Sequence, residues 1–442
     1  MKFTLTVMKR FSAFGRLEAL LALMASVSSV GAAGGELAVA ASEALPRICI
    51  VTNAAGAFFS DRPDGAPLLL RGFNYVRLRQ GDHATFDAAT KTTSANYDAA
   101  RAESMLGALQ SNGFNVVRVF IIGRSAVNPG IAGDVGETVG VFAPYMENVL
   151  DFLRRAERHR VHVFPTFGDG ELPRSRHYRA MLSPSQHGAN AVYFTPEGIA
   201  AKARYVSDFL SYLRQREPRL LTTLLGVQCQ NELSVDADAW PFTVTNGLLA
   251  MPNGRSYEMS NAAQRRALMN DGLAHYHGAL KEAVRAVDAP LLVAEGIFTQ
   301  AAVGKALETH EGIWPGSAKD RRFPPDLVAL GQGPLDFLDI HYYRTSRQAE
   351  LAADFRAHMH SSRWFAPAMS EIRHRKPVIL GEFGAFRFVE RSYAEVVPNM
   401  VAIRELALRA GLRGHLYWTY DCAEQQDLYF ATEDDGLLLK KL

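Results

Sequence analysis

Residues 225–234, LGVQCQNELS, run from an apolar segment directly into an amide and a carboxylate, Asn231 and Glu232. Burial of a charged side chain is costly unless the charge has partners or a function. An apolar run that ends in polar residues is typical of a parallel strand, which is buried along its length and open at its carboxyl end. The segment therefore predicts a buried strand that carries a polar site at its end.

Seven further runs of this kind occur along the chain, and helical patterns, with apolar residues three and four positions apart, separate most of them. This alternation predicts an α/β fold in which a parallel sheet closes into a (β/α)8 TIM barrel, with an open doubly wound sheet as the alternative. The runs are LRGFNY from Leu70, FNVVRVFII from Phe114, RVHVFPTF from Arg160, PLLVAEGIF from Pro290, LDFLDIHYY from Leu335, KPVILGEFG from Lys376 and RGHLYWTYD from Arg413.

A short hairpin is predicted ahead of the first barrel strand. Residues 47–78 hold two apolar runs, and Asp61, Pro63, Asp64 and Gly65 interrupt them. Aspartate, proline and glycine favour turns, so we expect the hairpin to turn at these residues and to lead into the strand at Leu70.

The composition of the 442-residue chain favours neutral partners. The formal net charge is +2, and neither sign forms a long block, so no nucleic-acid partner is indicated. Cys49, Cys229 and Cys422 lie far apart, permit at most one disulfide and form no zinc spacing. No Gly-rich phosphate loop follows an early strand, because GQGPLD at Gly331 lacks the flanking strand and helix. We expect a monomer without a metal or another cofactor.

The first forty residues differ from the rest of the chain. Lys9, Arg10 and Arg16 precede the apolar and small residues ALLALMASVSSVGAAGG. This order is typical of a secretory signal, and the apolar stretch is shorter than the roughly 20 residues of a membrane span. We expect residues 1–40 to be a cleaved leader, residues 45–442 to be a single catalytic barrel domain, and the protein to be secreted or periplasmic without stable membrane insertion. A flexible tail or a retained anchor is the alternative.

Polar residues gather at the predicted carboxyl ends of the strands, which is the face where barrel enzymes carry their active sites. Two of them, Glu232 on strand four and Glu382 on strand seven, would face one another across the barrel mouth. The others are Arg118 on strand two, Asn231 on strand four, His341 and Tyr343 on strand six, and Trp418 on strand eight.

Two facing carboxyl groups suit the cleavage of a glycosidic bond. One gives a proton to the leaving oxygen, and the other attacks the sugar, with about 5–5.5 Å between them when configuration is retained. Arg118 is expected to hold Glu382 ionised, since a cation within about 4–6 Å favours the carboxylate. Glu232, which follows an apolar strand beside a neutral amide, is expected to keep the proton. Glu295 ends strand five, and we expect it to support the site or contact substrate.

Each of these residues also has an ordinary structural interpretation, and the argument for function rests on their joint position. A metal-dependent lyase or isomerase is one rival, with Glu295, Glu232 and Asp339 as the available ligands. Asp339 is expected to point away from the site. A secreted carbohydrate-binding barrel without catalytic activity is the other rival.

The motifs QNE, HYY, LGEFG and YWTYD at these strand ends, with RGFNY at the first strand, resemble clan A of the retaining glycoside hydrolases, most closely the cellulase-like family five. The resemblance spans Gly72 to Asp421. It implies hydrolysis of β-linked polysaccharide of the mannan, glucan or cellulose type. The implied roles are Asn231 on the sugar 2-hydroxyl, Glu232 as acid/base, Glu382 as nucleophile, Arg118 and Tyr343 as its partners, His341 lining the site and Trp418 beneath the sugar.

Two positions depart from the commonest pattern of that family. Leu233 stands where many members have proline, and Phe167 ends strand three where a histidine that contacts substrate is common. Both departures are compatible with the mannanase-like branches. The catalytic pair is unchanged, so the departures bear on the substrate rather than on the mechanism.

Overall fold

The computed structural model describes residues 44–442 except residues 124, 126, 134–139, 169–171, 173–175, 183–187, 306–312 and 317–318. The chain divides into two units, residues 1–41 and residues 42–442. The predicted leader, residues 1–40, lies outside the described residues and stays a prediction.

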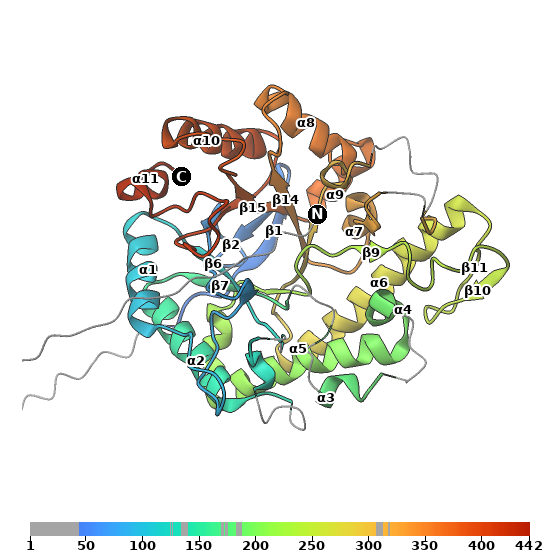
Figure 1. Cartoon of the computed structure of the whole chain (residues 1–442), viewed down its shortest axis with the longest axis horizontal. Helices are drawn as coiled ribbons and strands as arrows, with labels where there is room; N and C mark the ends of the chain where they lie inside the picture. The colour runs from blue at the N-terminus through green and yellow to red at the C-terminus, as the bar shows by residue number, and fades with distance from the viewer. Residues whose placement is uncertain are drawn as a thin grey trace, which may run out of the picture. The chain divides into compact units, whose positions relative to one another are not determined.

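Residues 42–442 form a closed barrel of eight parallel strands with helices packed around it, which confirms the predicted fold class (Figure 1). Each of the eight quoted runs contains one of the barrel strands. The strands are β3 (Leu70–Asn74), β6 (Val116–Phe120), β7 (His162–Thr166), β8 (Val227–Gln228), β12 (Val293–Phe298), β14 (Phe337–Tyr343), β15 (Val378–Gly384) and β16 (Gly414–Trp418).

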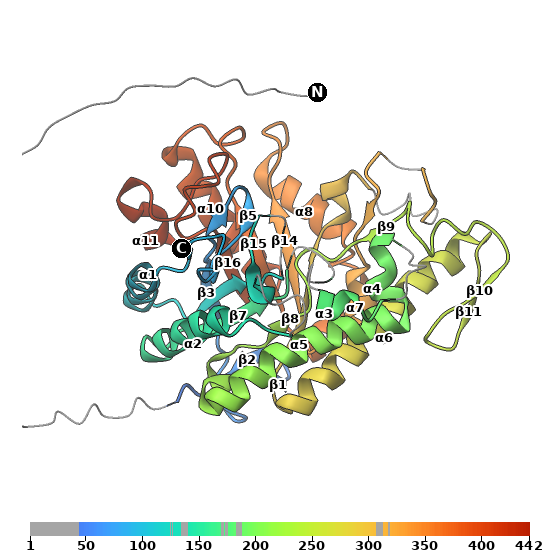
Figure 2. The same cartoon turned by 60° about the horizontal axis from the view of Figure 1, so that its bottom comes forward.

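The helices follow the apolar patterns of the sequence. Helix α5 begins as expected, because Thr195 accepts a hydrogen bond from the amide of Gly198 and Pro196 is the first helical residue. Helices α5 and α6 pack side by side, as both views show (Figure 1 and Figure 2). The longer helices are α1 (Ala99–Ser111), α2 (Ala143–Arg158), α5 (Pro196–Arg216), α6 (Ala262–Val287), α8 (Leu351–Ser361), α9 (Pro367–Arg375) and α10 (Tyr393–Arg409).

Shorter elements complete the fold. In the described part of the chain, no helix combines the length and the apolar character that crossing a membrane requires. The three cysteines are free thiols. The shorter elements are the helices α3 (Arg176–Arg179), α4 (Ala191–Phe194), α7 (Leu327–Gln332) and α11 (Leu437–Lys441), and the two-stranded pairs β4 (Leu78–Arg79) with β5 (Asp82–His83), β9 (Val235–Asp236) with β13 (Arg322–Phe323), and β10 (Leu248–Ala250) with β11 (Ser256–Glu258).

The predicted hairpin is present, but it turns earlier than expected. Strands β1 (Cys49–Asn53) and β2 (Gly56–Ser60) pair in antiparallel register, so the chain reverses between Asn53 and Gly56. Gly56 has a φ of +108°, which favours glycine over residues with a side chain. The aspartate-rich stretch after Ser60 forms a second bend, which brings Leu68 back to a single bridge with Phe59.

The hairpin closes the amino-terminal end of the barrel. Its Ile48 and Phe59 belong to one buried cluster with an apolar side chain from each of the eight strand segments. Phe59 meets Phe337 edge to face with ring centroids 5.2 Å apart. A dry apolar layer therefore fills this end, and polar side chains occupy the opposite, carboxyl end. The members of the cluster are Ile48, Phe59, Leu70, Val116, Phe164, Leu225, Ala294, Phe337, Ile379 and Leu416.

Candidate active site

Arg118 lies at the centre of the polar layer and is completely buried. Its Nη1 donates to Glu382 Oε1 at 2.6 Å and to Asn74 Oδ1 at 2.8 Å. Its Nε donates to Gln228 Oε1 at 2.8 Å, and its Nη2 donates to Asn231 Oδ1 at 2.7 Å. A buried guanidinium is tolerated when its donors are satisfied in this way. Arg118, on strand two, thereby fixes residues from strands one, four and seven relative to one another.

Two of these partners, Asn74 and Gln228, were not predicted from the sequence. Asn74 also donates to the carbonyl of Gly381 at 2.9 Å, and Gln228 donates to Asp339 Oδ2 at 2.7 Å. Both face the barrel interior from the middle of apolar runs. An isolated amide in such a run was the available signal, because a buried amide needs a hydrogen-bond partner inside the barrel.

The two glutamates of the sequence analysis lie together at the mouth. One oxygen of Glu232, one oxygen of Glu382 and a ring nitrogen of His341 all lie within 4.8 Å of one another. Tyr343 donates its hydroxyl to Glu382 Oε2 at 2.9 Å. The arrangement joins an ionisable pair to a cation, an imidazole and a phenol, from strands two, four, six and seven.

The two carboxylates differ in their exposure to solvent. Glu382 is buried, and its burial raises its pKa, although His341 and Arg118 act in the opposite direction. The side chain of Glu232 remains 32% exposed. Arg118 lowers the pKa of Glu382, as expected, but the loss of hydration on burial has the larger effect, so the pKa is raised overall.

The backbone explains why Glu232 leaves the barrel interior. Its φ is +45°, in the left-handed region that residues other than glycine rarely adopt. Strand β8 has already ended at Gln228, so the alternation of inward and outward residues no longer applies at this position. Strained backbone of this kind is common at functional sites.

His341 links the two glutamates to a third carboxylate. Its Nδ1 lies 3.2 Å from Glu232 Oε1 and 3.5 Å from Glu382 Oε2, and its Nε2 lies 3.4 Å from Asp339 Oδ2. Burial alone would lower the pKa of His341, but Glu382 and Asp339 outweigh burial and raise it to about 10. The raised pKa favours the imidazolium form of His341, whose two ring nitrogens both face carboxylates that can accept its protons.

Asp339 points into the barrel, which corrects the expectation that it points away. It stands two residues before His341 on β14, and residues two apart share a face of a strand. Its carboxylate is fully buried and packs over Gly381, where an added Cβ would lie 2.0 Å from Oδ1 and 2.1 Å from Oδ2. Only glycine leaves room for Asp339 at this position.

Trp418 ends β16 beside the pair. It is 6% exposed and donates its indole N–H to Gln425 Oε1 at 2.8 Å. Phe120 meets it edge to face at 5.7 Å, and the ring of His83 stacks on Phe120 at 3.9 Å. These rings form an aromatic wall next to the polar layer.

Glu295 and Phe167 lie outside the mouth. Glu295 is fully buried, binds His277 Nε2 at 2.9 Å and accepts from the backbone amide of Gln230 at 3.0 Å. It thus supports the segment before Asn231, and it is not placed to contact a substrate. Phe167 is buried against α5, so its departure from the family pattern does not alter a substrate-contacting position.

The three ligands expected for the rival metal enzyme do not come together, although Glu232, His341 and Glu382 each bring one possible ligand atom within 4.8 Å of the others. Of the three ligands expected for the rival metal enzyme, Glu295 lies away from Glu232, as described above. His341 would have to lose a proton to bind a metal, because both its nitrogens face carboxylates. Arg118 already supplies a positive charge 2.6 Å from Glu382.

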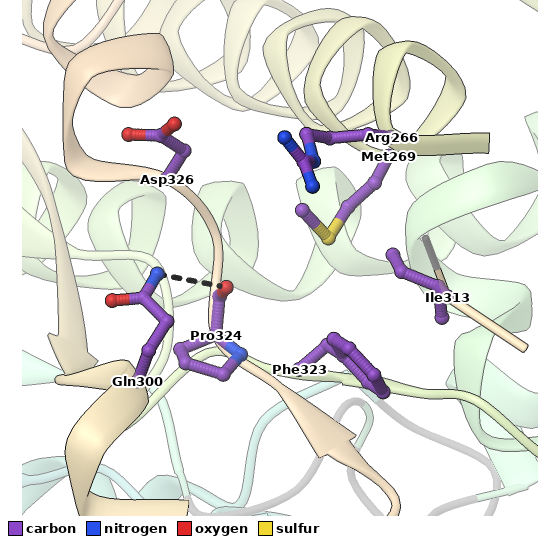
Figure 3. Close-up of a pocket in the computed structure, with 7 residues that line it drawn as sticks. All are labelled: Arg266, Met269, Gln300, Ile313, Phe323, Pro324 and Asp326. Carbon is purple, nitrogen blue, oxygen red and sulfur yellow. Dashed lines mark hydrogen bonds between the residues drawn. The ribbon is translucent and has the colours of Figure 1, made fainter. Parts of the chain in front are cut away.

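Two cavities are lined in part by residues of β13, one by Arg322 and the other by Phe323. The larger, about 240 Å³, borders Glu232 and also contacts Arg322. The smaller, about 20 Å³, has room for little more than a water molecule, so it is not a substrate site (Figure 3). Figure 3 shows its residues, Arg266, Met269, Gln300, Ile313, Phe323, Pro324 and Asp326.

The barrel fold is also found in solved structures of β-mannanases, which confirms the expected structural resemblance to glycoside hydrolases at the level of the fold. An endo-1,4-β-mannanase from Rhizomucor miehei superposes with a TM-score of 0.56 at 15% identity, covering 89% of this chain and 97% of that chain. A β-mannanase from the blue mussel Mytilus edulis gives a TM-score of 0.52 at 17% identity, covering 90% of this chain and 96% of that chain.

An exo-β-1,4-mannosidase from an Opitutaceae bacterium gives a TM-score of 0.51 at 20% identity, covering 84% of this chain and 55% of that longer chain. No protein-family model matches the sequence. No curated protein matches it either. The shared property is therefore the fold, and the chemistry has to be argued from the site.

Proposed function

We propose that this protein is a retaining β-glycoside hydrolase of clan A that cleaves β-linked mannan, with β-glucan or cellulose as the alternative substrate. The observation that carries the proposal is the pair Glu232 and Glu382, with one oxygen from each within 4.8 Å. This distance suits double displacement, because inverting enzymes hold their carboxyl groups about 6.5–9.5 Å apart to admit a water molecule. The mannan-active proteins of the same fold support the choice of substrate.

The proposed mechanism assigns one role to each glutamate. Ionised Glu382 attacks the anomeric carbon while Glu232 protonates the departing oxygen, which leaves a covalent glycosyl–Glu382 ester. Glu232 then takes a proton from water, the water oxygen attacks the anomeric carbon, and Glu382 departs as a carboxylate. Its contacts with Arg118 and Tyr343 orient Glu382 for the attack. Glu232, which is partly exposed, can exchange protons with solvent between the two steps.

Hydrolysis of purified polysaccharides tests the proposal. Mannan, cellulose derivatives, β-1,3-glucan and mixed-linkage glucan would be incubated with the protein, and the products separated by chromatography. Proton NMR of the first product should show the β-anomer, as retention requires. An initial α-anomer would overturn the double displacement. Binding of a glycan without any hydrolysis would instead support the carbohydrate-binding rival.

Replacing Glu232 with glutamine should affect substrates according to their leaving groups. We expect kcat/KM for a β-1,4-oligosaccharide to fall by about 10²–10⁴-fold, the usual contribution of a general acid. The value of kcat/KM for a dinitrophenyl glycoside should fall much less, because its leaving group departs without protonation. Steady-state and burst kinetics on both substrates measure the difference. An equal fall in kcat/KM on the two substrates would show that Glu232 is not the general acid.

The pH dependence follows from the burial of Glu382. Its pKa is raised, and Glu382 must be ionised to attack, so activity is lost as the pH falls through this raised value. We expect the acidic limb of kcat/KM to lie above the ordinary glutamate value of 4.5. Tyr343→Phe removes a hydrogen bond that lowers the pKa, and it should move the limb to still higher pH. An acidic limb at or below 4.5 in the unmodified protein would contradict this prediction.

The basic and apolar start of the chain supports export to the periplasm or the medium, where a polymeric substrate is accessible. Cell fractionation with N-terminal sequencing of the mature protein tests this part of the proposal.

A further inference from the structure

The 240 Å³ pocket beside Glu232 is built from four separate segments. Gln230, Asn231, Glu232 and Ser234 follow strand β8, and Phe298 ends strand β12. Tyr193 comes from α4, and Arg322 comes from β13. The complete lining is Tyr193, Gln230, Asn231, Glu232, Ser234, Phe298 and Arg322. Glu232 thus borders both this pocket and the space it shares with Glu382.

Arg322 is held in a fixed orientation at the edge of this pocket. Its Nε and Nη2 donate to the two oxygens of Asp320 at 3.1 Å and 2.8 Å, and its guanidinium lies 5.0 Å from the centre of the Phe298 ring. Its side chain is nevertheless 54% exposed. Among the described residues, Nη1 has no hydrogen-bond acceptor. A pre-oriented donor therefore stands beside a ring at the edge of the pocket.

Gln230 provides the complementary acceptor. It is 5% exposed, and its Nε2 donates to the hydroxyl of Tyr193 at 2.6 Å. Its Oε1 is buried and has no partner in the described part of the chain. A buried acceptor of this kind lowers stability unless a ligand or water donates to it. The pocket wall thus combines an unpaired acceptor, an available donor and a ring.

We infer that this pocket binds the sugar that leaves in the first step, and that Arg322 and Gln230 select it. The inference rests on the proposed function, because the acid must touch the oxygen that joins the two sugars. The hydroxyls of a pyranose can accept from Arg322 and donate to Gln230, and its C–H face can pack on Phe298. Asp320 already balances the charge of Arg322, so the pocket is suited to a neutral hexose rather than to an acidic sugar.

The test compares Arg322→Met with a neighbouring control. Methionine keeps an apolar chain against Phe298 and removes the donors. Arg321→Met is the matched control, because Arg321 is 62% exposed, pairs with Asp236 and Asp238, and does not line the pocket. For each variant, kcat/KM is measured with a β-1,4-linked mannohexaose and with a dinitrophenyl β-mannoside, whose leaving group is not a sugar.

For Arg322→Met, the ratio of kcat/KM on mannohexaose to kcat/KM on the dinitrophenyl glycoside should fall by about tenfold, the scale of one lost hydrogen bond. Transfer of the glycosyl group to an added mannobiose acceptor should fall in parallel, and Arg322→Lys should restore part of both. The Arg321→Met variant should keep the original ratio. An unchanged ratio in Arg322→Met, or the same fall in Arg321→Met, would overturn the inference.

The outcomes also separate the inference from the proposed function. An unmodified protein that cleaves the dinitrophenyl glycoside but not the hexasaccharide would overturn the inference and leave the catalytic pair standing. Failure to cleave either substrate, or the glycans of the earlier screen, would overturn the proposed function, and the inference with it. A greater preference for a uronate-containing oligosaccharide than for mannohexaose would overturn the assignment of a neutral sugar.

Discussion

Glu382→Gln should reduce kcat by more than about 10⁴-fold, the scale of loss seen when a covalent nucleophile is removed. An amide of the same size keeps the shape of the site, but it cannot form the ester with the sugar. The amide oxygen of glutamine can still accept a hydrogen bond from Arg118 or Tyr343, so oligosaccharide binding should persist. Kinetics and calorimetric titration with the same oligosaccharide measure the two effects.

Glu390→Gln is the matched control for this change. Glu390 is also buried and follows the same strand, but its partners are Arg344 and Asn399, away from the pair. Its loss should lower thermal stability and leave kcat close to the original value.

Azide added to Glu382→Gly should restore turnover and give an α-glycosyl azide, because the small anion takes the place of the missing carboxylate. Full activity in Glu382→Gln would exclude Glu382 as the nucleophile.

Gly381→Ala should destabilise the barrel by at least about 3 kcal/mol, the scale on which overpacking and a disturbed buried ion pair act. The new Cβ would lie 2.0 Å from Asp339 Oδ1, which real contacts do not permit. The carboxylate would have to leave Gln228 and His341, and His341 would lose a charged partner in the barrel interior. Glu382, the next residue, would shift as well, so activity should fall together with the thermal midpoint.

Two further variants make this prediction specific. Gly278→Ala lies in helix α6, where the nearest atom to the new Cβ is 3.9 Å away, and it should stabilise by about 0.5–1 kcal/mol. Asp339→Ala combined with Gly381→Ala should recover part of the lost stability, because the clash is gone. Differential scanning calorimetry compares the four proteins. A Gly381→Ala protein as stable as the original would show that Asp339 does not pack over this position.

The barrel can be predicted from the sequence because each barrel strand has a distinct pattern of residues. Each strand is a near-continuous apolar run, and parallel strands covered by helices require that pattern. The predicted turn after Ser60 forms and carries one antiparallel bridge, Phe59 to Leu68, but the paired strands of the hairpin reverse earlier, because two turn signals compete within thirty residues. The aspartate and glycine at positions 64 and 65 look stronger, but Gly56 supplies the left-handed conformation that the tight reversal uses.

The candidate site shows where sequence patterns fail. Residues at the strand ends come together because parallel strands place their carboxyl ends on one face, and this requires no knowledge of side-chain direction. The direction in which the Glu232 side chain points depends on the left-handed backbone conformation of Glu232 itself, which lies beyond the end of the strand. The periodicity of the sequence does not predict such a conformation. The direction of Asp339 follows from a simpler rule. Asp339 lies two residues before His341 on β14, and residues two apart on a strand share a face.

The plugged end of the barrel also defines where the stable unit begins. Leu45 and Ile48 are 3% and 1% exposed, and Ile48 packs into the layer that closes the barrel. Trimming past Ile48 would open the floor of the barrel to water. An amino-terminal truncation that reached this layer would therefore disturb the floor of the barrel, at the end opposite Glu232 and Glu382.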